Sequence, residues 1–441
     1  MYRAWVNLPQ NAPLVHSLPR YERLIPQFWD ILGTAMTEQL IYLDNAATSW
    51  PKPDSVGEAM VDFLAHHAGN PGRGGHRLAR EATQVLDDAR ERLAKLVNAP
   101  CSNRMILCHG CTDALNLAIH GVIRADMRAR CDNTKPHVVT TAIEHNAVLR
   151  TLHCYATSDL ITMTIVPCDD QGYVHADKLI EACTDCTVLM TLSHASNVLG
   201  TIQPVEETIR SVRAHDPEIL IMVDAAQTAG HFPIDVQGWD IDLLPLAGHK
   251  GLRGPTGTGG LYVSPRAYPD ECDKSRVFCQ RRGGTGSKAP GLEMPTNLPD
   301  ALEAGTANAV GFAGLVAAID ALSHEVHEHE MAMTDQVLKG LHKLDGVTIY
   351  GLPTIEGRTP VVLFNIEGMK PREVMAKLDA DHCIAVRGGV HCAPLLHEAL
   401  GTGCDGGVRV SPGSGTTSEQ INLFLDAVRP MCPQHANPTQ H

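Results

Sequence analysis

The stretch Leu243-Leu244-Pro245-Leu246-Ala247-Gly248-His249-Lys250-Gly251 decides the fold that we expect for this chain. Its apolar residues predict a buried strand, and the strand delivers Lys250 into a turn punctuated by glycine. A second apolar run, Ile219-Leu220-Ile221-Met222-Val223, leads directly into Asp224. Because parallel strands of an α/β sheet end at the same edge, the sequence predicts that an amine and a carboxylate meet there.

An amine and an acid placed in this way are typical of enzymes that use pyridoxal phosphate. The lysine forms a Schiff base with the cofactor aldehyde, and the aspartate keeps the pyridine nitrogen protonated so that the ring absorbs electrons. Each residue also has a simpler interpretation. Lys250 alone would more often be a surface lysine after a strand, since lysines are rarely buried, and Asp224 alone could cap a helix. The residues at the ends of the other predicted strands help to decide between these interpretations.

Strand and helix patterns alternate through the first two-thirds of the chain, which predicts an α/β fold with a mostly parallel sheet. Three further strands end beside polar residues: Gly110-Cys111-Thr112, Glu144-His145 and Ser196-Asn197. The carboxyl edge of an open α/β sheet is where such folds bind ligands. Five strands with polar ends therefore predict one site at that edge. The three strands named here by their ends are expected to begin at Met105, His137 and Thr187, and a sixth strand is expected to begin at Gly260.

The pattern changes after Gly305, and we expect a smaller C-terminal α+β domain. A long helix is predicted from about Gly314 to Leu344, with an exposed acidic face at Glu325, Glu328 and Glu330. Shorter strands follow, and a last helix covers Ser418–Val428. The expected organisation is a loosely held extension at 1–37 (or a natural start at Met36), a segment at 38–60 that packs with the small domain, a large cofactor-binding domain at 61–305, the small domain at 306–430 and a disordered tail at 431–441.

Composition excludes several classes of function. The formal charge is -14, from 36 basic and 50 acidic residues, so nucleic acid or an anionic membrane is not the expected partner. No apolar run reaches the length of a membrane span, and no secretory signal precedes the first strand. The 14 cysteines are scattered, which argues against a disulfide scaffold and for a reduced, cytoplasmic setting.

Two Cys-x-x-Cys pairs, Cys108/Cys111 and Cys183/Cys186, raise the alternative of a zinc site. Cys111 falls in a turn expected to bind phosphate, and Cys186 precedes a core strand. We therefore predict no metal.

The motifs together resemble a known family. Arg387-Gly388-Gly389-Val390-His391-Cys392-Ala393 looks like the nucleophile loop of the group II cysteine desulfurases, and the whole set resembles the class V aminotransferase family of fold-type I pyridoxal phosphate enzymes. The resemblance spans roughly residues 40–430. It implies pyridoxal phosphate as cofactor, L-cysteine as substrate, a homodimer, and a protein that accepts sulfur for iron–sulfur cluster or thiocofactor assembly. The other motifs, in chain order, are Ile41-Tyr42-Leu43-Asp44-Asn45-Ala46-Ala47-Thr48, Ala142-Ile143-Glu144-His145-Asn146, Ser196-Asn197-Val198-Leu199-Gly200-Thr201, Asp224-Ala225-Ala226-Gln227, Gly248-His249-Lys250 and Glu303-Ala304-Gly305-Thr306.

For the cofactor phosphate, the resemblance implies contacts at the start of one helix. Cys111 and Thr112 would bind it there, where backbone N–H groups and the helix dipole suit an anion. His249 would add a further contact. Many relatives carry a hydroxyl two residues before this histidine, whereas this chain has Ala247. Thr285, in a glycine-rich segment, is expected to reach the phosphate of a partner subunit.

For the cofactor ring, the resemblance implies four contacts besides Lys250. His145 would stack on the ring and move protons, since imidazole titrates near neutrality. Asp224 would pair with the pyridine nitrogen and Gln227 with the phenolic oxygen. Asn197 would lie near both the cofactor and the substrate carboxylate. Taken alone, a histidine after a strand would more often be an ordinary polar residue.

Cys392 distinguishes a desulfurase from its aminotransferase cousins. Sulfur removal needs a thiolate that attacks the substrate's sulfur and keeps it as a persulfide; such a thiol should be exposed, with Arg387 and His391 nearby as cations. Arg409 and Arg387 are expected to bind the substrate carboxylate. The alternatives are an inert Cys392 among the 14 cysteines and an arginine in an edge strand at Arg409.

Two other functions remain open from the sequence. One is a selenocysteine lyase, or another C–S lyase of the same fold. The other is a sulfur carrier without turnover that uses Cys392 alone; the pair Asp224 and Lys250 argues against it.

Overall fold

The computed structural model describes residues 40–433 except 73, 133, 272–273 and 286–290. The expected extension at 1–37, the alternative start at Met36 and residues 434–441 of the expected tail lie outside the described residues. Arg429–Met431, at the border of the expected small domain and the tail, forms a short 3₁₀ turn. The description that follows concerns the chain from Tyr42 onward.

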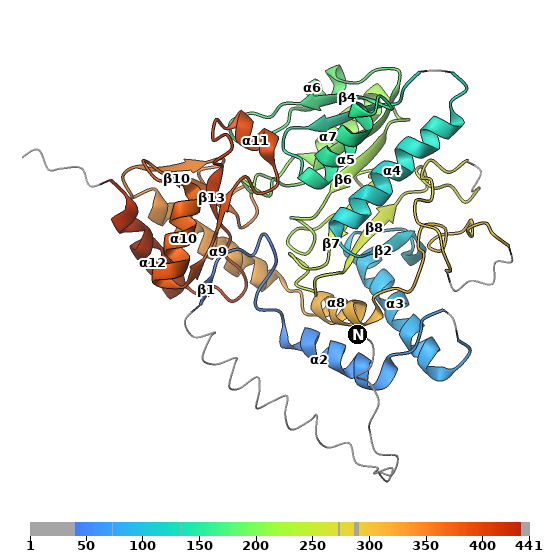
Figure 1. Cartoon of the computed structure of the whole chain (residues 1–441), viewed down its shortest axis with the longest axis horizontal. Coiled ribbons are helices and arrows are strands. Elements are labelled where there is room, and N and C mark those ends of the chain that lie inside the picture. Colours follow the sequence, from blue (N-terminus) through green and yellow to red (C-terminus); the bar gives the residue numbers. More distant parts are fainter. Residues whose placement is uncertain (1–39, 73, 133, 272–273, 286–290, 434–441) are drawn as a thin grey trace, which may run out of the picture. The chain divides into compact units, whose positions relative to one another are not determined.

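A seven-stranded sheet forms the centre of the larger part of the fold (Figure 1). β3 to β7 run parallel, whereas β8 is antiparallel to both of its neighbours, β2 and β7. The predicted α/β fold with a mostly parallel sheet is therefore confirmed. In spatial order the strands are β2 (Met105–Cys108), β8 (Gly259–Val263), β7 (Leu243–Ala247), β6 (Leu220–Asp224), β5 (Thr187–Ser193), β3 (His137–Thr141) and β4 (Thr162–Val166).

β4 is absent from the sequence prediction, and its position explains why. It lies at the sheet edge, and most of its residues are partly or fully exposed. The other strands are almost wholly buried, so they read as continuous apolar runs, whereas an exposed edge strand does not.

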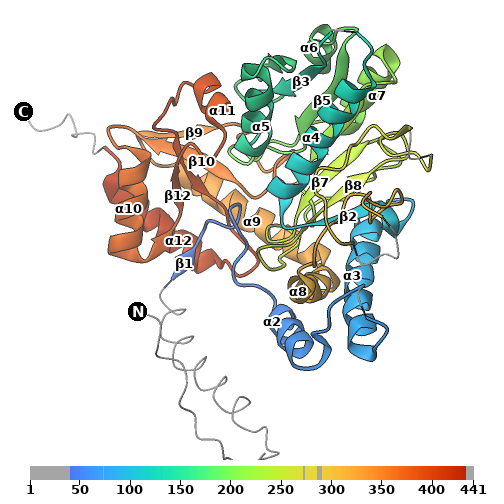
Figure 2. The same ribbon diagram turned by 45° about the vertical axis from the view of Figure 1, so that its right-hand side comes forward.

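Helices cover both faces of this sheet (Figure 2). Alternate residues of β6 show the arrangement: Leu220 and Met222 pack in one cluster with α4 and α5, while Ile221 and Val223 pack in the other with α3, α7 and α8. Each such side chain contributes about 1.5–3 kcal/mol when it leaves water. The helices of this part are α2 (Asp54–Asp62), α3 (Arg77–Leu96), α4 (Cys111–Ala129), α5 (Asn146–Thr157), α6 (Ala176–Glu181), α7 (Val205–His215) and α8 (Ala309–Asp320).

The C-terminal part carries a second, smaller sheet of four antiparallel strands, in agreement with the expected α+β pattern. α12 occupies the residues predicted for the last helix. In spatial order the strands are β12 (Arg387–Gly389), β13 (Gly407–Val410), β10 (Val362–Ile366) and β9 (Val347–Tyr350), and the helices are α9 (His324–Leu341), α10 (Pro371–His382), α11 (Pro394–Ala399) and α12 (Ser418–Val428).

The single helix predicted from Gly314 to Leu344 is wrong. It is two helices, α8 and α9, bent by 81° at a short break. Ser323 is extended there (φ -142°, ψ 155°), and the helix-forming residues on both sides hide the break from the sequence pattern. No single helix in the described part of the chain is long and apolar enough to span a membrane, although this bent pair passes that test of length and composition when taken together.

The predicted exposed face of α9 also needs a correction. Glu325 and Glu328 are exposed, but Glu330 is 5% exposed and lies 3.1 Å from His231. The helix turns this carboxylate toward the large sheet, which a single-helix pattern does not reveal.

The segment that follows β1 (Ile41–Tyr42) joins the small domain, where β1 pairs with β11 (Ile384–Ala385) in a two-stranded sheet. The backbone N–H of Leu43 donates to the Ala385 carbonyl at 2.8 Å, and that of Ser411 donates to the Leu43 carbonyl at 2.7 Å. These bonds bring Asp44 and Ala46 to the rim of the site described next.

Candidate active site

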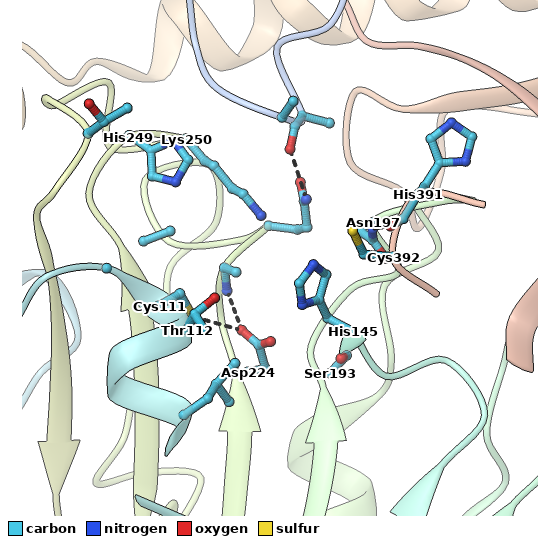
Figure 3. A pocket seen from close by; sticks show the side chains of 18 of the residues that line it. Cys111, Thr112, His145, Ser193, Asn197, Asp224, His249, Lys250, His391 and Cys392 are labelled. Atoms are coloured by element: carbon cyan, nitrogen blue, oxygen red, sulfur yellow. Dashed lines mark hydrogen bonds between the residues drawn. The ribbon is translucent and has the colours of Figure 1, made fainter. Parts of the chain in front are cut away.

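A cavity of about 620 Å³ lies at the carboxyl edge of the large sheet and is closed on one side by loops of the small domain. Its volume suits a cofactor together with a small substrate. Figure 3 shows side chains from both parts converging on it. The structure brings together every predicted site residue except Thr285: Cys111, Thr112, His145, Asn197, Asp224, Gln227, His249, Lys250, Arg387, Cys392 and Arg409.

Thr285 does not line this cavity. Its expected contact is with a partner subunit, which a single chain does not test, so its role stays a prediction.

The start of α4 offers a cradle for an anion. Gly110 occupies the N-cap position with φ 150°, and no side chain caps the helix. The first backbone N–H groups of α4, from Cys111 and Thr112 onward, therefore face the cavity without the usual capping oxygen. His249 lines the same cavity, and its Nδ1 is buried without a hydrogen-bond partner among the described residues. Both features fit a phosphate.

His249 is uncharged at neutral pH. Burial lowers its pKa to about 4, with Lys250 and Lys52 as further causes. A neutral imidazole can still donate one hydrogen bond. Ala247 also lines the cavity, so the position that carries a hydroxyl in many relatives is apolar here.

Asp224 lies on the floor of the cavity, at the end of β6. It is 6% exposed, and its Oδ1 accepts hydrogen bonds from the Ala226 backbone N–H at 2.9 Å and from the Cys111 thiol at 3.4 Å. Burial and then Asp224 itself raise the pKa of Cys111, so the thiol stays protonated and donates. A turn rather than a helix follows Asp224, so the helix-cap alternative does not hold.

Lys250 enters the cavity from the turn after β7. Burial lowers the pKa of its amine, so more of it is neutral, and therefore nucleophilic, than of an exposed lysine. Figure 3 shows its side chain reaching toward the middle of the cavity. The turn requires glycine: a Cβ at Gly251 would lie 2.5 Å from the Ala229 carbonyl oxygen. The surface-lysine alternative does not hold either.

His145 caps α5 and faces the cavity as well. Its Nδ1 accepts a hydrogen bond from the Ala147 backbone N–H at 3.0 Å, so the proton of the neutral ring sits on Nε2. Burial and then Lys250 lower its pKa, which favours the neutral ring. Figure 3 places this ring between Asp224 and Cys392.

Glu144, the residue before His145, binds the ends of two strands, a role that the sequence did not assign. It is fully buried and accepts hydrogen bonds from the Ser193 backbone N–H at 2.7 Å and hydroxyl at 2.9 Å. Thr141 donates a third bond at 2.8 Å. Burial, and then Asp224, raise the pKa of Glu144 to about 7. Glu144 thereby ties the ends of β3 and β5 together under the site.

Two arginines form the wall opposite Lys250. Arg409 is 2% exposed; it donates to the Asn197 carbonyl at 2.9 Å and pairs with Asp44 at 2.7 Å. It lies on a central strand of the small sheet, not on an edge strand. The strand register sets Arg387 directly beside it. Sequence reasoning missed Asp44, although it lies in one of the quoted motifs.

The loop that carries Cys392 is held on three sides. Its carbonyl accepts from the Asn146 backbone N–H at 2.7 Å, and the preceding carbonyl, of His391, accepts from the Asn197 amide at 2.6 Å. An Arg387 guanidinium nitrogen lies 3.9 Å from the Cys392 sulfur. The sulfur faces the cavity and is partly buried, which corrects the expectation of an exposed thiol.

His391 and Cys392 both adopt left-handed backbone conformations, with φ 50° and 60°. Such a conformation costs a residue with a Cβ on the order of 1 kcal/mol or more. Two of them in succession persist only because surrounding contacts hold the loop.

A relay of side chains supplies part of that support. Nε2 of His391 donates to the Arg387 carbonyl at 3.1 Å, because a carbonyl only accepts. Nδ1 of the same neutral ring therefore accepts, and the partner nitrogen, Nε2 of His397 at 3.2 Å, donates. The Thr402 hydroxyl completes the relay at 2.8 Å from Nδ1 of His397. Sequence reasoning did not single out His397 or Thr402.

The relay requires a neutral ring at His391, since that ring donates from Nε2 and accepts at Nδ1. Burial lowers the pKa of His391 to about 2 and that of His397 to about 4. The expectation that His391 acts as a cation beside Cys392 is therefore wrong, and Arg387 is the charged neighbour that the structure places there.

Comparison with known proteins agrees with the fold and with the ordered motifs. The family model described as Aminotransferase class-V matches residues 41–424. The chain is 34% identical over 396 residues to a probable cysteine desulfurase of Methanothermobacter thermautotrophicus, covering 87% of this chain and 92% of that one. It is 35% identical over 367 residues to a probable cysteine desulfurase of Halalkalibacterium halodurans, covering 82% and 86%.

Solved structures give the same result. The apo cysteine desulfurase of Thermococcus onnurineus NA1 matches with a TM-score of 0.80 and 30% identity, covering 90% of this chain and 96% of that one. The cysteine desulfurase CsdA of Escherichia coli matches with a TM-score of 0.76 and 27% identity, covering 91% and 97%. On the strength of the family match and of these relatives, the chain belongs to the class-V aminotransferase family.

Proposed function

We propose that this protein is a pyridoxal phosphate-dependent cysteine desulfurase, which converts L-cysteine to L-alanine and keeps the sulfur as a persulfide on Cys392. The observation that carries the proposal is the meeting of Lys250 and Cys392 in one cavity, from opposite parts of the fold. An aminotransferase needs the lysine but has no use for the thiol. The similar proteins named as cysteine desulfurases support the same reading.

The residues present fit the cofactor that the family implies. Cys111, Thr112 and His249 would hold the phosphate at the uncapped start of α4, and Asp224 would pair with the pyridine nitrogen on the cavity floor. Gln227 lines the same cavity and donates to the Ala46 carbonyl at 3.2 Å; we assign it to the phenolic oxygen. When bound, pyridoxal phosphate supplies an electron sink for negative charge at the substrate Cα.

Lys250 is the residue that we assign to proton transfer at the substrate Cα. Its lowered pKa keeps part of the amine unprotonated, which a base requires. Asn197, Arg387 and Arg409 would orient the substrate carboxylate, since a guanidinium fork holds a carboxylate in a defined direction. His145, with its proton on Nε2, faces the same space and would pass protons to the reacting atoms.

Cys392 completes the reaction. Its thiolate attacks the sulfur of the bound substrate, so a new S–S bond forms while the Cβ–S bond breaks and leaves its electron pair on the carbon side. Protons delivered within the cavity convert that fragment to alanine. The sum, cysteine plus thiol to alanine plus persulfide, needs no external oxidant or reductant. Arg387 stabilises the thiolate from 3.9 Å.

The wider setting belongs to the same proposal. We assign the protein to the cytoplasm and to a homodimer in which Thr285 reaches the partner's phosphate site. The persulfide would pass to a protein acceptor for iron–sulfur cluster or thiocofactor assembly.

The test is to incubate the holoenzyme with L-cysteine, quantify alanine, and locate the persulfide by mass mapping. Cys392→Ala should keep the cofactor absorbance and lose alanine formation from cysteine. Cys404→Ala, at an exposed cysteine of the same domain, is the matched control and should behave as wild type. Sulfide release by Cys392→Ala at the wild-type rate would refute the persulfide step, and faster turnover of selenocysteine than of cysteine would identify a selenocysteine lyase.

A further inference from the structure

Three potential metal ligands meet outside the cavity described above. His231 lies in the turn that follows β6, and His327 and Glu330 lie one helical turn apart on α9. One donor atom from each lies within 4.8 Å of the other two. His231 is far in sequence from the other two, which is why the cysteine pairs and not this group drew attention as a possible metal site.

Two polar atoms of the group are buried without a hydrogen bond. Nδ1 of His327 and Oε2 of Glu330 have no hydrogen-bond partner among the described residues. Glu330 is 5% exposed, so its carboxylate has little access to solvent. Leaving a buried charged oxygen unsatisfied costs more than the roughly 1–3 kcal/mol of a neutral group. Something other than the described side chains is needed to satisfy it.

The contact between His231 and Glu330 points to what that is. Nδ1 of His231 lies 3.1 Å from Oε2 of Glu330, close enough for an ion pair but without the geometry of a hydrogen bond. Two ligands of one tetrahedral zinc ion, each bound at about 2.0–2.1 Å, lie about 3.3 Å apart. The observed separation is close to that expected for two ligands of one ion, and the contact lacks the geometry of a direct hydrogen bond between them.

A small cavity borders the same group. Its volume is about 20 Å³, and His231, Glu330 and Arg253 are among the residues that line it. That volume holds about one water molecule. A water there could serve as a fourth ligand.

We propose that His231, His327 and Glu330 bind one divalent cation of the zinc type, completed by a water molecule. Two imidazoles and one carboxylate favour zinc or cobalt over magnesium or calcium, which prefer ligand sets made of oxygen alone. The ion would join α9 to the turn of Lys250: the space that a Cβ at Gly251 would fill is 2.6–2.8 Å from the ring of His231. Its role is to fix that turn, not to take part in the sulfur chemistry.

Arg253 opposes the ion and provides a second test. It lines the small cavity, so its positive charge acts against a bound cation. Arg253→Gln should therefore bind the metal more tightly than wild type. If Glu330 served only as a counter-ion for protein groups, the same substitution would not create tighter metal binding.

The experiment is a titration of chelator-treated holoenzyme with Co²⁺, followed by competition with Zn²⁺. We expect one equivalent with visible ligand-field bands and no thiolate-to-cobalt charge-transfer band, since the ligands are nitrogen and oxygen. His327→Ala and the isosteric Glu330→Gln should each weaken binding by more than about 100-fold, since loss of even an outer-shell partner costs about 10–100-fold. His324→Ala, at a solvent-exposed histidine of the same helix, is the matched control and should bind as wild type.

Three results would overturn the proposal: no cobalt site free of thiolate in wild type, unchanged affinity in both ligand variants, or equal loss in His324→Ala. The readout is metal affinity, so it does not depend on turnover of cysteine. Circular dichroism of each variant shows that lost binding is not lost folding.

Discussion

The two walls of the active-site cavity are built on different principles. On the Lys250 side, the chemical groups follow directly from strand ends: β6 ends at Asp224, and β7 is followed within three residues by Lys250. On the Cys392 side, the nucleophile sits in a loop with two left-handed residues, held by hydrogen bonds from remote residues such as Asn146 and Asn197. The first wall is set by sheet topology, and the second by side-chain contacts over long sequence distances.

This difference predicts that the two walls can be disabled separately. In the proposed mechanism, the Lys250 wall carries proton transfer at Cα, and the Cys392 wall carries sulfur transfer. Exchange of the Cα proton of L-alanine in D₂O measures the first without the second, since alanine has no sulfur. Alanine formation from L-cysteine requires both.

The largest effect is expected for Lys250→Ala. A positioned acid–base group contributes about 10²–10⁴-fold, and Lys250 also anchors the cofactor, so both alanine exchange and turnover of cysteine should fall to background. Lys343→Ala, at an exposed lysine of the small domain, is the control. Persistent alanine exchange in Lys250→Ala would show that another base acts at Cα.

The contrast also explains how far the sequence could predict the molecule. The buried strands of the sheet and the positions of Asp224 and Lys250 follow from apolar runs that end in polar residues, because buried parallel strands leave that pattern. The edge strand β4 does not, and the roles of Gln227 and His249 come from the family resemblance.

The break between α8 and α9 does not follow from the sequence pattern either, because helix-forming residues stand on both sides of Ser323. Asp44 pairs with Arg409 across 365 residues, and no local pattern records such a contact. Glu144 and His397 have nearer partners, but their roles depend on a loop and strand-end geometry that apolar periodicity does not show.

Substitution of His397 is expected to have a smaller effect, which is limited to alanine formation from cysteine. His397→Leu removes the donor that holds His391, and loss of a buried hydrogen bond worth about 1.4 kcal/mol corresponds to roughly ten-fold. Alanine formation from cysteine should therefore slow about ten-fold, while alanine exchange stays at the wild-type rate. His397→Gln, which keeps an amide donor, should recover part of the loss. A parallel fall in both reactions would mean that His397 supports the whole cavity and not the nucleophile loop.

The smallest effect concerns stability at acid pH and also arises from the Cys392 wall. His391 and His397 are buried and neutral, with pKa values of about 2 and about 4 against 6.5 in an unfolded chain. Below pH 6.5 the two histidines bind protons in the unfolded chain but not in the folded protein, so the free energy of unfolding falls as the pH falls. Each histidine contributes a slope of up to about 1.4 kcal/mol per pH unit, and the contribution of His397 ends near pH 4, where its folded form also becomes protonated. In denaturant unfolding between pH 7 and pH 5, His397→Gln should lose less stability than wild type, because one of the two titrating rings is gone. Equal losses in both proteins would show that the His397 ring takes up a proton in the folded state as readily as in the unfolded chain, against the pKa that its burial lowers.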